Sequence, residues 1–152
     1  MSVAFRRESD DEHKEPRFDI PLPPGPNLVT TRGLELIRAR VAKLEAAADS
    51  ATDDEARTAL RRDLKYWHTR DTTAQIAPVP DDAEVAFGSR VTYRLGGREA
   101  TIDLVGSDEA EPPASIPFTA PLAQALIGLT PGETDQLGDR EVTVVATGPI
   151  PA

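Results

Sequence analysis

The stretch AAADSATDDEAR, residues 46–57, separates two helical patterns and decides the fold of the first half of the chain. Before it, four apolar residues recur at alternating spacings of three and four: Leu34, Ile37, Val41 and Leu44. After it, a second apolar face, interrupted by Asp71, holds Leu60, Leu64, Trp67 and Ala74. Such spacings are typical of the seam between packed helices. Because the connection is short, we predict an antiparallel hairpin, a short coiled coil, over residues 30–77, with Thr30 or Thr31 as its N-cap.

The turn of this predicted hairpin is rich in carboxylates: Asp49, Asp53, Asp54 and Glu55. Clustered carboxylates can hold a divalent cation. The same stretch also fits a capping box, in which Thr52 accepts from the third helical N–H and Glu55 reaches back. Asp53 and Asp54 then lie in the first turn, where the helix dipole favours negative charge. We interpret the stretch as a capped helix start and assign no metal site.

A stripe of basic residues follows the turn: Arg57, Arg61 and Lys65, with Arg62 beside it. Residues four apart lie on one face of a helix. Such a stripe can meet nucleic-acid phosphates. It can also be the solvent face of an amphipathic hairpin, and the composition favours that second reading.

After Glu84 the hydrophobic period changes to two, which indicates strands. Four segments show this period: residues 85–95, 98–106, 115–118 and 140–148. Residues 121–129 are typical of one short helix, with Pro121 at a permitted first position. The predicted fold class is therefore α+β, a helical hairpin followed by a small, mostly antiparallel sheet domain with one short helix. We place an extended proline-rich leader at 1–29, a linker at 78–84 and the sheet domain at 85–152.

The composition excludes several classes of function. The 152 residues include no cysteine, which excludes disulfides, cysteine-ligated metals and thiol catalysis. No apolar stretch is long enough to span a membrane, and the first residues lack a secretory h-region, so we expect a cytoplasmic protein without membrane contact. Residues 75–152 carry 4 Lys+Arg against 12 Asp+Glu, a balance that disfavours wrapping free duplex DNA.

Motifs that carry chemistry are also lacking in the sequence. No nucleophile–base pair, phosphate loop or zinc spacing occurs, and His13 and His68 are isolated from any ligand set. The acids of the second half are best explained as solvated loop residues: Asp103, Asp108, Glu109 and Glu111. We therefore expect no catalytic residue, no metal and no cofactor of the protein's own.

The most specific motif is SIPFTAPLAQALIGLTPGE, residues 115–133. In order and spacing it resembles a run in the C-terminal domain of the Gre transcript-cleavage factors, with Ala120 where the family prefers Ser and Glu133 where it prefers Asp. Three more strand segments resemble the same domain: VAFGSRVTY, IDLVGSDEAE and EVTVVAT. The stretch VTTRGLELIRARVAKLE, residues 29–45, is similar to the opening of the family's coiled coil, where a Thr precedes a Gly by three residues.

The resemblance implies an FKBP-like C-terminal domain that docks on bacterial RNA polymerase at the rim of its secondary channel, and a coiled coil that enters the channel. In cleavage-active members, acids at the tip help to hold a second Mg²⁺ at the polymerase's own active site. The factor is then no enzyme itself, and its contact with nascent RNA or DNA is indirect. We expect a monomer. The candidate docking residues are Ser115, Ile116, Pro117, Phe118, Pro121 and Leu122, although core packing explains Ile116 and Leu122 equally well.

Two departures from the family pattern shape the predicted function. The tip has acids but lacks the family's D-x-S-E-N-x-E-Y motif, and the arm from Arg32 to Ala48 spans 17 residues, about 26 Å. The layout is similar to the short Rnk-type relatives. We therefore predict a polymerase-binding regulator with little or no cleavage. An active cleavage factor that uses the tip acids, and a regulator of a nucleotide-metabolism enzyme, are the alternatives.

Overall fold

The structure is a computed structural model that describes residues 19–152. Most of the predicted leader, including His13, lies outside the described residues. The chain forms two compact units. Within the described residues, one unit joins residues 19–25 with Ile37–Thr73, and the other joins Pro26–Leu36 with Ala74–Ala152. The second unit therefore begins well before the predicted sheet-domain boundary at residue 85.

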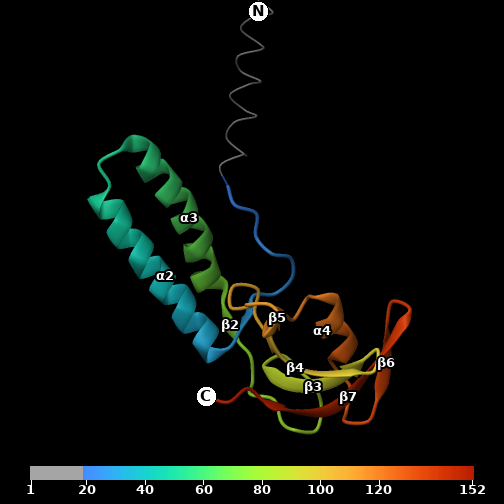
Figure 1. The fold of residues 1–152 in the computed structure, drawn as a ribbon. Coiled ribbons are helices and arrows are strands. Elements are labelled where there is room, and N and C mark those ends of the chain that lie inside the picture. The colour runs from blue at the N-terminus through green and yellow to red at the C-terminus, as the bar shows by residue number, and fades with distance from the viewer. Residues whose placement is uncertain (1–18) are drawn as a thin grey trace, which may run out of the picture. The chain divides into compact units, whose positions relative to one another are not determined.

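The predicted helical hairpin is formed by α2 (Thr31–Ser50) and α3 (Asp54–Thr73) (Figure 1). All of it belongs to the first unit except the start of α2, up to Leu36. Each helix has 20 residues, so each is about 30 Å long. Two ion pairs join the helices: Arg38 pairs with Asp71, and Glu45, later in α2, pairs with His68, earlier in α3. The two helices are therefore antiparallel, and no helix within residues 19–152 is long and apolar enough to cross a membrane.

The predicted apolar seam is only partly buried. Leu34, Ile37 and Val41 of α2 are buried. The remaining seam residues are half-buried: Leu44, Leu60, Leu64, Trp67 and Ala74. Two stacked helices shield each other on one side only, so most of this seam keeps some contact with solvent.

The second arm ends four residues before the predicted end at residue 77. Gln75–Ile76 form strand β2, which pairs in parallel with β1 (Leu28–Val29). The Gln75 N–H donates to the Asn27 carbonyl and the Ala77 N–H to the Val29 carbonyl. These hydrogen bonds satisfy backbone groups that a longer helix would need, and Pro78 follows at once, so the helix stops at Thr73.

The second unit contains a five-stranded sheet in the order β5-β4-β3-β7-β6. Its strands are β3 (Ser89–Leu95), β4 (Arg98–Val105), β5 (Ser115–Pro117), β6 (Thr134–Leu137) and β7 (Arg140–Pro149). Only β4 and β5 pair in parallel, so the prediction of a mostly antiparallel sheet is confirmed. The turn between β3 and β4 consists of Gly96 and Gly97, both with positive φ, as a two-residue hairpin loop requires.

The core of this unit lies between the sheet and the short helix α4 (Pro121–Leu126), which covers one face of the sheet in Figure 1. Nine buried apolar residues form it: Val85, Val91, Ile102, Leu104, Ala123, Ala125, Leu126, Val142 and Val144. The predicted helix over 121–129 is shorter than expected: it ends at Leu126, and residues 127–128 form a turn. The pairing of β3 with β7 shifts register between Thr92 and Tyr93, so β7 carries a bulge there.

Candidate functional site

The hairpin tip is capped, but by a different residue from the one predicted. Helix α3 begins at Asp54, and the Asp53 Oδ2 accepts from the Ala56 N–H at 3.0 Å. Asp53 is therefore the N-cap, and the predicted Thr52–Glu55 capping box is wrong by one residue. An Asp serves as an N-cap as well as a Thr does, so the sequence pattern alone left both starts open.

The tip acids are close in sequence, but they do not form a metal site. Asp54 pairs with Arg57 at 3.3 Å while its side chain stays 98% exposed. Asp49 and Glu55 are exposed as well. Within residues 19–152, no group of three or more His, Asp or Glu side chains is arranged to hold a metal ion. One tip acid is committed to the cap, and the other three face solvent.

The three residues of the predicted basic stripe have separate environments. Arg57 closes the turn, because its guanidinium donates to the Ala51 carbonyl at 2.9 Å. Lys65 pairs with Asp19 at 3.0 Å. Arg61 is exposed. Two of the three cations thus contact other parts of the first unit, which fits a solvent face better than a phosphate-binding stripe.

The candidate docking segment lies at one edge of the sheet and at the start of α4. Ile116 and Leu122 pack against the core, so their side chains serve the fold. Ser115 is half-buried, and its Oγ accepts from the Glu111 N–H at 2.7 Å. Phe118 packs edge-on against Phe87, with ring centroids 5.3 Å apart. Pro117 is half-buried in β5.

Pro121 differs from the other candidates because it is exposed. It occupies the first turn of α4, where its missing N–H costs no hydrogen bond. Of the six candidate docking residues, Pro121 is therefore the one whose side chain a partner can reach without disturbing the core.

Sequence reasoning missed a contact between the start of α2 and the loop after β4. The Thr30 Oγ1 accepts from the Gly33 N–H at 2.9 Å, so Thr30 is the N-cap of α2. The same hydroxyl donates to the Glu109 carboxylate at 2.5 Å. A Cβ on Gly33 would lie 2.8 Å from Glu109 Oε1, so a larger residue there would require the Glu109 carboxylate to shift. The sequence predicted Thr30 or Thr31 as the cap, and the structure shows Thr30 in that role, whereas no local signal pointed to Glu109.

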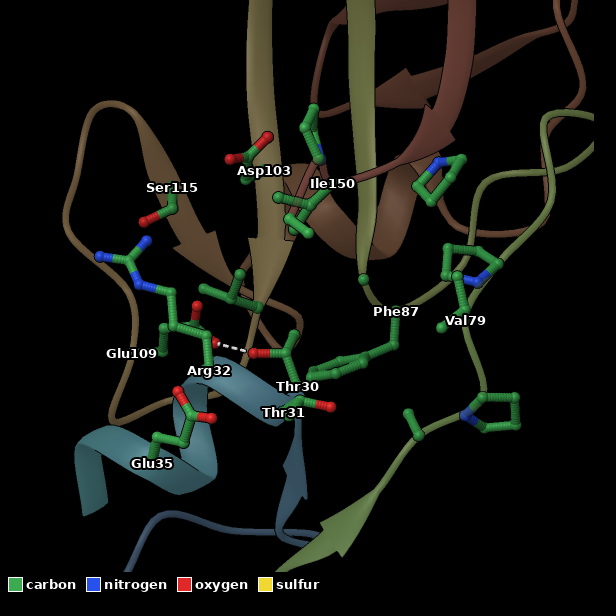
Figure 2. A pocket seen from close by; sticks show the side chains of 18 of the residues that line it. Thr30, Thr31, Arg32, Glu35, Val79, Phe87, Asp103, Glu109, Ser115 and Ile150 are labelled. Carbon is green, nitrogen blue, oxygen red and sulfur yellow. Dashed lines mark hydrogen bonds between the residues drawn. The ribbon is translucent and has the colours of Figure 1, made fainter. Parts of the chain in front are cut away.

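This contact borders a pocket of about 610 Å³, which lies wholly within the second unit. Figure 2 shows Phe87 and Val79 on one side of the pocket and Arg32, Glu35 and Glu109 on the other. The dashed line in the figure marks the hydrogen bond from Thr30 to Glu109. The pocket thus has an apolar wall and a charged wall.

Two carboxylates of this unit are fixed by strong local partners. Asp103, which lines the pocket, receives two hydrogen bonds from the Arg90 guanidinium, at 2.8 and 3.1 Å. These hydrogen bonds, and then the charge of Asp103, raise the pKa of Arg90. Outside the pocket, the N–H and hydroxyl of Thr130 donate to Glu133, each at 2.8 Å, and lower the pKa of that carboxyl.

A comparison with known protein families finds a match for the sheet domain. The hairpin and the curled, mostly antiparallel sheet define an α+β protein of two units. Residues 80–146 match the family model described as "Transcription elongation factor, GreA/GreB, C-term". The sheet domain therefore resembles the C-terminal domain of the GreA/GreB transcription elongation factors. The resemblance seen in the sequence is thereby confirmed.

Three solved structures show a weaker similarity to this chain. They include GreA factor homolog 1 (Gfh1) of Thermus thermophilus, at 20% identity over 81% of this chain and 99% of that one, with a TM-score of 0.38. Gfh1 of Thermus aquaticus has 20% identity over 81% and 98%, with a TM-score of 0.40. GreA/GreB of Nitrosomonas europaea has 18% identity over 82% and 99%, with a TM-score of 0.38. A search of the curated proteins gave no match.

Proposed function

We propose that the protein is a transcription elongation regulator that binds bacterial RNA polymerase, with the sheet domain as the docking part and the hairpin entering the secondary channel. It stimulates little or no transcript cleavage. The observation that carries the proposal is the GreA/GreB match over residues 80–146, which covers the domain with the candidate docking residues. Factors of this family act on the polymerase, and the acidic sheet domain does not suit direct wrapping of duplex DNA.

The tip supports the absence of strong cleavage. The Asp53 carboxylate accepts a hydrogen bond as the N-cap of α3. The Asp54 carboxylate forms an ion pair with Arg57, whose positive charge partly offsets that of Asp54. Direct coordination of Mg²⁺ requires a carboxylate oxygen within about 2.0–2.1 Å of the ion. Each helix of the hairpin provides about 30 Å of reach. A capped, partly neutralised tip on arms of this length is a poor donor of metal ligands.

The decisive experiment uses purified RNA polymerase stalled in backtracked complexes with Mg²⁺. We expect the protein to release no more short RNA than the polymerase releases alone. It should also slow the cleavage stimulated by a cleavage-active Gre factor, because the two compete for one channel. Short RNA released in proportion to added protein would contradict the proposal.

The alternative, an active cleavage factor, makes a different demand on the tip. The side chain of Asp54 is 98% exposed, which is what a metal ligand for another protein's site requires. Asp54→Asn combined with Glu55→Gln should then abolish cleavage. Asp53 should be left unchanged in this variant, because its loss would also remove the helix cap.

Docking through the sheet domain is tested at Pro121. Pro121→Asp places a charge on an exposed site, and an acid in the first turn of a helix is favourable for folding. We expect polymerase affinity to fall at least about tenfold, since a buried contact would gain an unpaired charge. Pro131→Asp, at an exposed turn of the same domain, is the matched control and should leave the affinity unchanged. Phe118→Asp is less clean because Phe118 packs on Phe87.

A further inference from the structure

The pocket beside Thr30 has no role in the function proposed so far. Its volume of about 610 Å³ lies within the range of roughly 300–1,000 Å³ that is usual for ligand pockets. A long side chain together with part of its backbone fits a space of this size. The question is which chemistry the two walls select.

The apolar wall suits an aliphatic stem. Phe87, Val79 and Ile150 line it, and Val79 is 82% exposed although it is a large apolar side chain. Pro78 and Pro80 hold the Val79 segment between them. Proline fixes the backbone dihedral φ, so the two prolines limit the conformations open to this segment. A ligand that covered Val79 would remove apolar surface from water.

The opposite wall is acidic. Glu35, Glu109 and Glu111 line the pocket together with Asp103, and among the described lining residues Arg32 is the only cation. Asp103 is neutralised by Arg90, and Glu109 accepts from Thr30 at the start of α2. Glu35 and Glu111 are exposed, and neither has an ion pair within the described chain. Two carboxylates are therefore available to a cation.

The charges and the arrangement of the acids disfavour two other classes of ligand, anions and metal ions. A phosphate or nucleotide would face an excess of carboxylates, in a domain whose residues 75–152 carry 4 Lys+Arg and 12 Asp+Glu. A metal ion would need ligands that converge, and no such group of acids occurs in residues 19–152. Arginine and lysine carry a cation at the end of an apolar stem, so the stem can contact the apolar wall while the cation contacts the acidic wall.

We infer that this pocket binds a basic side chain, arginine or lysine, presented by the RNA polymerase surface on which the sheet domain docks. The stem lies along Phe87 and Val79, and the cation meets Glu35 and Glu111. The inference rests on the proposed function for the identity of the partner. The pocket would then provide an electrostatic contact in addition to the docking residues near Pro121. Contacts of this kind affect the association rate and the orientation of the partners more than the affinity.

A first experiment tests the pocket without the polymerase. The full chain is titrated with N-acetyl-arginine amide and followed by NMR of its backbone amides. We expect shifts at Phe87, Ser115 and Ile150 in the wild type and their loss in Glu35→Gln combined with Glu111→Gln. N-acetyl-glutamine amide, a neutral probe, should cause no such shifts. Equal shifts with both probes, or shifts spread over the whole sheet domain, would overturn the inference.

A second experiment measures polymerase affinity as a function of salt. The double variant Glu35→Gln with Glu111→Gln should bind about three- to tenfold more weakly at low salt and show a smaller salt dependence, because two exposed charge contacts are lost. The control, Asp135→Asn with Glu141→Gln, removes two exposed acids of β6 and β7 and should behave as wild type. Equal binding by both double variants would overturn the pocket contact.

The two failures are distinguishable. If the wild type does not bind polymerase at all, the proposed function fails, whereas the amide titration still decides whether the pocket takes a basic side chain. If Pro121→Asp weakens binding and the Glu35 and Glu111 variant does not, docking stands and the inference about the pocket is wrong.

Discussion

The two units of the molecule differ in how they are held together. The sheet domain buries nine apolar residues around α4, and Leu104, Leu126 and Val142 have no exposed surface. The hairpin helices bury only three apolar side chains, Leu34, Ile37 and Val41, and the cross-helix ion pair between Arg38 and Asp71 is partly exposed. Exposed ion pairs contribute about 0–1 kcal/mol each. We therefore expect the sheet domain to resist unfolding more strongly than the hairpin does.

A matched pair of leucine truncations should give the largest effect. Leu126→Ala removes a side chain with no exposed surface and should lower the unfolding free energy of the sheet domain by about 2–5 kcal/mol. Leu64→Ala, in the half-buried seam of the hairpin, should cost clearly less. Hydrogen exchange read peptide by peptide separates the two units. Equal losses of unfolding free energy in the two variants would show that the two units do not differ in stability.

A smaller effect is expected where two backbone segments meet within the second unit. A Cβ on Gly106 would lie 2.6 Å from the Leu28 carbonyl oxygen, and a backbone atom cannot move aside cheaply. Gly106→Ala should therefore cost about 1–3 kcal/mol of unfolding free energy. Gly148→Ala is the control, since its Cβ would meet nothing within 4 Å. Denaturant unfolding of both variants checks the difference, and a neutral Gly106→Ala would show that β1 is loosely held.

The hairpin tip offers a test of the weaker unit. Asp53→Ala removes the α3 cap and should cost about 0.5–2 kcal/mol, seen as faster amide exchange around Ala56. Asp49→Ala removes an exposed acid of the same tip and should change exchange little. If the two variants behaved alike, the tip acids would act through their charge and not through capping.

The smallest effect concerns pH. The Thr130 hydrogen bonds lower the pKa of Glu133, so this contact stabilises the folded state above the ordinary carboxyl pKa and is lost as the pH falls through the lowered value. The stability difference between wild type and Glu133→Gln should therefore vanish in acid. A carboxyl titration of Glu133 by NMR measures the shift directly. If Glu133 titrated at the ordinary carboxyl pKa, its contact with Thr130 would not stabilise the sheet domain.

Periodic patterns predicted the large elements of the fold. The heptad seam gave the two helices, and alternation gave β3, β4, β5 and β7 close to their observed ends. The elements that were missed lack any period. β1 and β2 have two residues each, and β6, with the sequence TDQL, has no apolar alternation. Such strands form because partners arrive from elsewhere in the chain, which a local pattern cannot show.

The candidate sites show the same limit. The tip acids were found by composition, but the cap moved from Thr52 to Asp53 because both residues are competent and only the helix start decides. The contact of Thr30 with Glu109 joins residues 79 positions apart. Glu109 was expected to be a solvated loop acid, and nothing near it in sequence indicates otherwise. The pocket is lined by segments far apart in the chain, so no local pattern could predict it either.

The tip turn has a consequence for how such proteins can change over evolution. Its contacts are all local, from Asp53 to Ala56 and from Arg57 back to Ala51. One heptad inserted into each arm would lengthen the hairpin by roughly 10 Å and leave this turn untouched. Reach and tip chemistry are therefore separately adjustable traits. Evolution can therefore shorten or lengthen the hairpin arms without changing the residues of the tip turn.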